Sequence, residues 1–269
     1  MTRTNLFHTL FLVASLSVIA TPVFSQTDTT VYAVVDYMKV QPGKEQAYVD
    51  LEQKTWQAIH QERLKARMIV GWYLYSVRFP AGSNYEYNYT TVNVVNKFAD
   101  LDFPFSEELV LKAHPKAKLP ELINNTLAAR DRVWQKVWVL LDQVRPETPQ
   151  PTPSRHVTID YMKVKPGGEQ AYLDLEQKLW KPVHQLRVKS GLGGSWQLYA
   201  LLYPGGSGTE YNYGTANFFK NFTDLENPYP GDLFARALPN MALSELEAKT
   251  MSARDLVRSE VWELIDYVQ

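Results

Sequence analysis

One stretch of the chain, from Asp36 to Arg63, occurs a second time from Asp160 to Arg187, with each aligned position 124 residues further on. Both copies carry Asp-Tyr-Met-Lys-Val, then a Pro-Gly pair, and later a Trp, a His and an Arg. The match continues without insertion or deletion towards the end of the chain, and about half of the aligned positions are identical. The period is too long for a solenoid repeat. The pattern therefore predicts two copies of one domain-sized unit.

The boundaries of the units follow from composition. Residues 146–155 contain four prolines and nothing that packs a core, which is typical of an extended linker. The length of 269 residues suits two domains of ordinary size. We predict a first unit over residues 26–145, a proline-rich linker over 146–155 and a second unit over 156–269.

Residues 1–25 read as a secretory signal peptide. Arg3 supplies a positive charge, Leu6 to Ala20 are mostly apolar, and Ser25 precedes the expected cleavage position. The alternative, a membrane anchor, needs about 20 apolar residues, which this run does not reach. The sequence therefore predicts an exported protein, periplasmic or extracellular, with no membrane span after cleavage.

Periodicity predicts the same order of elements in each unit: strand, helix, strand, strand, helix, strand. This βαββαβ order is that of the ferredoxin-like fold, in which helices cover only one face of a four-stranded sheet. The strand expected over 71–80 is apolar on both faces, so the bare face needs a cover. We predict an α+β fold of two tandem ferredoxin-like domains packed sheet to sheet as a pseudo-symmetric barrel, which makes a pseudo-dimer within one monomeric chain. In the first unit we expect strands over 31–40, 71–80, 85–95 and 133–144, a helix over 44–67 and a helical region over 100–132.

The segment Lys-Val-x-Pro-Gly-x-Glu at residues 39–45 and 163–169, together with this order, resembles the dimeric α/β-barrel superfamily. That superfamily includes NIPSNAP-like proteins, antibiotic-biosynthesis-type monooxygenases and EthD-like proteins. The resemblance covers residues 31–144 and 157–268. It implies two associated sheets, and some members bind haem or aromatic substrates between sheet and helices. No haem-ligand motif transfers to this chain, so no cofactor is predicted.

Three side chains recur on the first helix of each unit. At helical spacing they lie on the flank of the apolar stripe, where they can border a groove between helix and sheet. One interpretation is a ligand-binding Trp/His pair in which the imidazole acts as acid, base or ligand contact. The other is a Trp at the edge of the core beside a hydrogen-bonded His. Pro182 is expected to kink the second helix. The six residues are Trp56, His60, Arg63, Trp180, His184 and Arg187.

A second set recurs on the third expected strand of each unit. With the period of two of a strand, its two tyrosines and its asparagine share one face. Rings, hydroxyls and an amide suit a pocket of mixed polarity, and equally suit aromatic packing between strands. The residues are Tyr87, Tyr89 and Asn93 in the first unit and Tyr211, Tyr213 and Asn217 in the second.

The sequence gives little support for nucleic-acid binding, for metal binding or for catalysis by paired carboxylates. The formal charge of −1 argues against a nucleic-acid partner. The histidines lack the spacing of metal ligands, and the chain has no cysteine, so no metal site is predicted. Asp36 and Asp142 are expected on neighbouring strands, as are Asp160 and Asp266, but ion pairs are the commoner role of such acids.

Two functions remain open from the sequence. The first is an exported small-molecule-binding protein with an aromatic and histidine-lined groove in each unit. The alternative is a monooxygenase- or isomerase-like enzyme acting on a small aromatic or apolar substrate. In that alternative His60 or His184 is the candidate base, and Tyr87 or Tyr89 orients the substrate.

Overall fold

A computed structural model describes residues 30–82, 84–102, 106–206 and 208–269. The predicted signal peptide and its cleavage position lie outside these residues. Within them, every helix is too short or too polar to cross a bilayer.

The elements of residues 30–144, called the first half, recur in residues 156–268, called the second half. The first half contains β1 (Tyr32–Lys39), α1 (Glu45–Leu51), η1 (Glu52–Trp56), α2 (Gln57–Lys65), β2 (Gly71–Phe79), β3 (Tyr89–Val95), η2 (Phe98–Leu101), α3 (Glu107–Ala113), α4 (Leu119–Ala129) and β4 (Asp131–Val144). The second half contains β5 (His156–Lys163), α5 (Glu169–Leu175), η3 (Glu176–Trp180), α6 (Lys181–Lys189), β6 (Ser195–Tyr203), β7 (Tyr213–Phe219), η4 (Phe222–Leu225), α7 (Leu233–Ala237), α8 (Leu243–Ala253) and β8 (Asp255–Val268).

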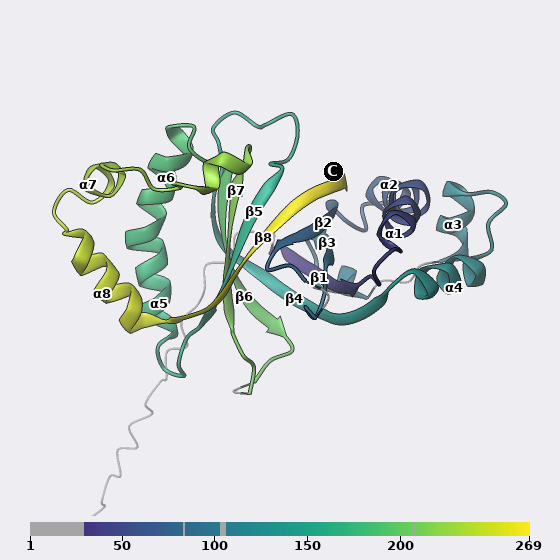
Figure 1. Cartoon of the computed structure of the whole chain (residues 1–269), viewed down its shortest axis with the longest axis horizontal. Coiled ribbons are helices and arrows are strands. Elements are labelled where there is room, and N and C mark those ends of the chain that lie inside the picture. Colours follow the sequence, from purple (N-terminus) through teal and green to yellow (C-terminus); the bar gives the residue numbers. More distant parts are fainter. Residues whose placement is uncertain (1–29, 83, 103–105, 207) are drawn as a thin grey trace, which may run out of the picture.

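The eight strands form one closed antiparallel barrel in the order β1-β3-β2-β8-β5-β7-β6-β4. Helices α1–α4 lie on one side of the barrel and α5–α8 on the other (Figure 1). The predicted fold class, two ferredoxin-like domains packed sheet to sheet, is therefore wrong. The strands of both halves belong to a single continuous sheet.

The length of the last strand of each half explains the difference. β4 and β8 each span 14 residues, longer than one half can pair. The first part of β8 pairs with β5 of its own half, and its last part pairs with β2 of the other. β4 pairs in the same way with β1 and then with β6. Closure leaves no free strand edge, which removes the usual route to edge-to-edge association.

Acidic side chains on these long strands contact helices of the opposite half. Asp142 on β4 pairs with Lys181 at the start of α6 at 2.7 Å. Asp266 on β8 accepts a hydrogen bond from Gln57 at the start of α2 at 2.8 Å. Asp36 and Asp142 lie on neighbouring strands, as predicted, but they do not meet, because Asp36 lies opposite Gln135, near the other end of β4.

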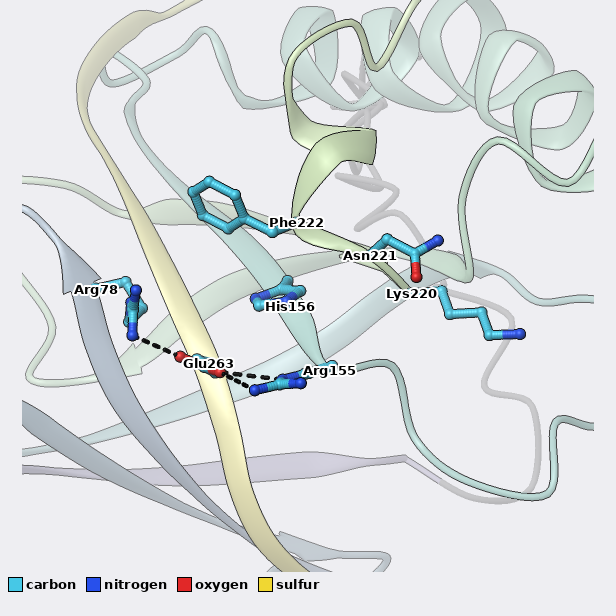
Figure 2. A pocket seen from close by; sticks show the side chains of 7 residues that line it. All are labelled: Arg78, Arg155, His156, Lys220, Asn221, Phe222 and Glu263. Atoms are coloured by element: carbon cyan, nitrogen blue, oxygen red, sulfur yellow. Dashed lines mark hydrogen bonds and ion pairs between the residues drawn. The ribbon is translucent and has the colours of Figure 1, made fainter.

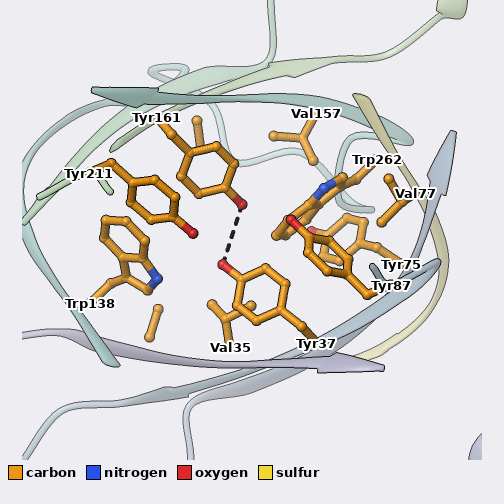
Figure 3. Packing of buried hydrophobic residues seen from close by; sticks show 12 residues of the cluster. Val35, Tyr37, Tyr75, Val77, Tyr87, Trp138, Val157, Tyr161, Tyr211 and Trp262 are labelled. Atoms are coloured by element: carbon orange, nitrogen blue, oxygen red, sulfur yellow. Dashed lines mark hydrogen bonds between the residues drawn. The ribbon is translucent and has the colours of Figure 1, made fainter. Parts of the chain in front are cut away.

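The interior of the barrel is packed with side chains from both halves. Tyr37 and Tyr161 point towards each other across the centre, with their hydroxyls 3.3 Å apart (Figure 3). Trp138 and Trp262 lie on either side of them. Because the other face of each strand lies under helices, the strands are apolar on both faces, as the sequence shows.

A π-helical turn interrupts the first helix of each half, η1 in one and η3 in the other. Such a turn contains an extra residue and rotates the side chains that follow it. It brings Trp56 and His60 onto the buried face of the helix rather than its flank. Because η1 forms without a proline, Pro182 is not the cause of the irregularity in the second half.

Candidate functional site

The recurring Trp, His and Arg of the first half lie together between α2 and the sheet. We call this group, with Trp72 and Asn93, the first cluster. The His60 ring stacks on Trp72 with centroids 4.7 Å apart. Arg63 donates from one terminal nitrogen to Asn93 Oδ1 and to His60 Nδ1, each at 2.9 Å. A guanidinium only donates, so Nδ1 accepts and His60 is neutral.

The second half has an equivalent group, the second cluster, formed by Trp180, His184, Arg187, Trp196 and Asn217. His184 stacks on Trp196 at 4.7 Å. Arg187 donates to Asn217 Oδ1 at 3.0 Å and more distantly to the Ser195 carbonyl at 3.4 Å. The structure thus brings together the predicted helix residues and the predicted asparagine in both halves.

The hydrogen bonding of Arg187 is incomplete. Its side chain is 0% exposed, yet Nε and one terminal nitrogen have no partner among the described residues. The same holds for Nδ1 of His184. The rings of Phe219 and Tyr229 lie 5.1 and 5.4 Å from the centre of the guanidinium. A buried cation with free donors is costly unless an anion or acceptor joins it.

A glycine explains part of the difference between the clusters. A β-carbon at Gly193 would lie 3.1 Å from Arg187 Nε. The equivalent residue of the first half is Ile69, which is buried. The missing side chain lets the Arg187 guanidinium lie against the backbone at Gly193, and no hydrogen bond to His184 Nδ1 forms there.

Burial controls the ionisation of both clusters. It lowers the pKa of His60 and of His184 well below the usual value, and the neighbouring guanidinium lowers each further. Both imidazoles are therefore neutral at pH 7. Burial also lowers the pKa of Arg187, while Tyr229 and Asp160 act in the opposite direction. Burial raises the pKa of Tyr229 to about 12.

A buried glutamate begins the π-helical turn of each half. Burial raises the pKa of Glu52 and of Glu176 to about 7, although Arg130 and Arg254 act in the opposite direction. The native state therefore favours the protonated carboxyl. Its contribution to stability is highest below pH 4.5, where the unfolded chain is protonated too, and falls as the pH rises to about 7.

Replacement of Glu176 by glutamine is expected to stabilise the protein at pH 8 and not at pH 4. The pKa rises from 4.5 to about 7, and one unit is worth about 1.4 kcal/mol, so the gain at pH 8 is about 3 kcal/mol. Urea denaturation at the two pH values measures it. An equal effect of the substitution at both values would contradict the assignment.

The predicted tyrosine row does not lie on one face. Tyr89 packs with Tyr48 under the helices, whereas Tyr87 points into the barrel. The reason is that β3 begins only at Tyr89, and the Asn88 side chain bonds the backbone N–H and carbonyl of Val40. Tyr213 and Tyr211 divide in the same way.

A charged group inside the barrel was missed from the sequence. Glu260 is fully buried, pairs with Arg258 at 3.1 Å and accepts hydrogen bonds from Tyr87 and Trp262. The equivalent residue of the first half is Lys136, which contacts the Tyr211 hydroxyl. Opposite charges at equivalent positions of the repeat were the signal that could have revealed this group.

The described residues contain no group of three or more side chains suited to hold a metal ion. Two clefts open elsewhere on the surface. One, of about 250 Å³, lies beside Tyr85 and Tyr87. The other, of about 380 Å³, lies beside His156. Neither is lined by the His and Arg of the two clusters, which form closed layers.

Comparisons with known proteins give a fold and no closer relationship. No protein-family model matches the chain, and no curated protein matches its sequence. A provisionally assigned monooxygenase from Fusobacterium nucleatum has a similar structure, with a TM-score of 0.55 and 10% identity over 90% of this chain and 95% of that one. A provisionally assigned monooxygenase from Lactobacillus acidophilus gives 0.51 and 9% over 88% and 93%.

These similarities, at so low an identity, concern the fold alone. Both structures align over nearly their whole length with both halves of this chain. The chain therefore shares the fold of these two structures, with its eight strands supplied by one polypeptide.

Proposed function

We propose that this protein binds a small organic anion, a carboxylate with a planar apolar body, in the second cluster. One observation carries the proposal: the buried Arg187 guanidinium has two nitrogens without a partner in the described chain. A carboxylate oxygen can accept a charge-assisted hydrogen bond from the free terminal nitrogen and offset the buried charge of the guanidinium. The ligand would replace the missing acceptor without a further charged residue.

The surroundings of Arg187 suit the apolar part of such a ligand. The Trp180 ring meets Tyr229 and Phe234 edge to face at 5.9 and 5.8 Å, and the Tyr229 and Phe234 rings lie 5.5 Å apart in a tilted arrangement. Tyr229 lies in the segment between η4 and α7, so its ring closes the layer from outside. We propose that the ligand enters by displacing this ring and lies between it and Trp180.

Binding of an aromatic carboxylate such as indole-3-acetate is expected to fall about 10- to 100-fold in Arg187→Met, because charge-assisted hydrogen bonds contribute about 1.5–3 kcal/mol. Calorimetric titration of the full chain measures this. Arg63→Met, the equivalent change in the first half, is the matched control and is expected to leave the affinity unchanged. Equal affinity in wild type and Arg187→Met would refute the site.

The fold supports a second candidate function, a monooxygenase- or isomerase-like enzyme, because both similar structures are described as provisional monooxygenases. His184 is the candidate base, since its imidazole is neutral beside Arg187. Tyr87 cannot orient a substrate for His60, because the two lie on opposite faces of the sheet. Turnover lost in His184→Ala with binding retained would favour this function.

We also propose that the chain arose by tandem duplication of one βαββαβ unit and that it is exported. The repeat at an interval of 124 residues supports the duplication, and the character of residues 1–25 supports export. Sequencing the amino terminus of the secreted protein tests the second point, with a new terminus near Gln26 expected.

A further inference from the structure

The cleft of about 380 Å³ lies on the outer surface of the barrel, where β8 of the second half pairs with β2 of the first. We call it the seam cleft. Figure 2 shows Glu263 of β8 between two guanidinium groups, Arg78 on one side and Arg155 on the other. His156 and Phe222 line the cleft above them.

The charges of the seam cleft leave it positive. One carboxylate oxygen of Glu263 accepts from Arg155 at 2.7 and 3.0 Å, and the other pairs with Arg78 at 3.0 Å. Lys220 also lines the cleft and makes no ion pair within the described chain. Three cations face one anion. Glu263 fixes the two arginines and leaves each with free N–H donors.

The seam cleft also contains a neutral hydrogen-bonding group, the imidazole of His156. The side chain of His156 is only 6% exposed, and its Nδ1 has no partner among the described residues. Its ring meets Phe222 edge to face at 5.5 Å. A buried imidazole nitrogen without a partner is unusual in a surface cleft and points to a polar ligand atom.

The equivalent position on the other side of the barrel is an internal control. There Tyr32 meets Phe98 edge to face at 5.8 Å, as His156 meets Phe222. The two arginines and the glutamate have apolar counterparts at the interval of 124, so the fold itself does not require these charges. Leu202, Val31 and Val139 replace Arg78, Arg155 and Glu263.

We propose that the seam cleft is a second binding site, separate from the second cluster, for a small molecule with a carboxylate or phosphate group. Arg78 and Arg155 hold the oxyanion, His156 contacts one of its polar atoms, and the apolar part lies on Phe222. Arginine forks suit both oxyanions, and the cationic lining attracts them to the cleft.

Phenyl phosphate and benzoate are suitable probes, each titrated calorimetrically into the full chain. The variant Arg78→Leu/Arg155→Val/Glu263→Val copies the counterpart side and so introduces residues that this fold already contains. It is expected to weaken phenyl phosphate binding about tenfold or more, since the charge-assisted hydrogen bonds are lost. Benzoate can also bind at Arg187, so its binding to the seam cleft is compared in the Arg187→Met background. Arg78→Leu alone keeps the test available if the triple variant does not fold.

Two controls separate this site from others. Lys97→Ala removes an exposed lysine next to Phe98 on the counterpart side and is expected to change nothing. Arg187→Met, in the second cluster, is also expected to leave phenyl phosphate binding unchanged. If Arg187→Met abolishes the binding and the seam variants do not, the seam cleft is refuted while the second cluster stands.

The histidine gives an independent readout. Side-chain NMR signals of His156 are expected to shift on addition of phenyl phosphate and to stay in place with phenol, which lacks the oxyanion. Absence of binding by either probe at millimolar concentration, or binding that leaves His156 unmoved and survives Arg78→Leu, would overturn the proposal.

Discussion

Glu260→Ala is expected to lower the free energy of unfolding by about 3–5 kcal/mol, the range found when one partner of a buried ion pair is removed. Glu260 is fully buried in the barrel and pairs with Arg258 at 3.1 Å. Its oxygens also accept hydrogen bonds from Tyr85, Tyr87 and Trp262. The Tyr161 hydroxyl donates more distantly, at 3.5 Å, so truncation leaves a cation and four donors without their acceptor.

Chemical denaturation of the full chain measures the loss. Glu260→Gln keeps an acceptor oxygen and is expected to lose less than the alanine variant. Glu247→Ala, an exposed position on α8, is expected to stay within about 0.5 kcal/mol of wild type. A Glu260→Ala protein as stable as Glu247→Ala would show that the group inside the barrel contributes little.

Trp196→Ala is expected to cost about 3–5 kcal/mol, the usual range for a buried tryptophan. The side chain is 0% exposed and lies in the core between the sheet and α5–α6. It also supports the His184 ring, so the second cluster should loosen together with the core. Thermal unfolding with ligand titration on the same sample reports both effects.

Trp134→Ala is the matched control, because that indole is 45% exposed on β4. Its indole N–H donates to Glu86, an exposed contact that contributes little. A loss of stability as large as that of Trp196→Ala would mean that the burial of the indole does not determine the loss of unfolding free energy.

The repeat made much of the structure predictable. Every strand and helix of one half has its counterpart in the other, so the sequence contains each hydrophobic pattern twice. The residues of the helix clusters were found because Trp, His and Arg recur at one spacing. The burial of these residues was not predicted, because nothing in the sequence marks the π-helical turn that rotates His60 and His184 inward.

The pairing of strands between the halves, which closes one continuous sheet, was missed for a different reason. Hydrophobic periodicity identifies a strand but not the strand that it pairs with. The last part of β8, from Val261 to Val268, alternates in the same way whether it pairs within its half or with β2. Likewise, the start of β3 depends on the Asn88 side chain, so the faces of Tyr87 and Tyr89 could not be read from spacing.

The unmatched positions of the repeat were the more useful functional signal. Three pairs of equivalent positions differ between halves that share one backbone. They are Ile69 and Gly193, Lys136 and Glu260, and Val139 and Glu263. Each difference lies beside a group with unusual hydrogen bonding or charge. Such substitutions change chemistry at a site while the common fold is kept.

A crystal structure of the full chain with an aromatic carboxylate tests the central claim most directly. The expected result is a carboxylate oxygen about 3 Å from the free terminal nitrogen of Arg187, with the Tyr229 ring displaced. A structure in which Arg187 and Tyr229 keep their present positions, while the carboxylate is bound elsewhere or not at all, would contradict it.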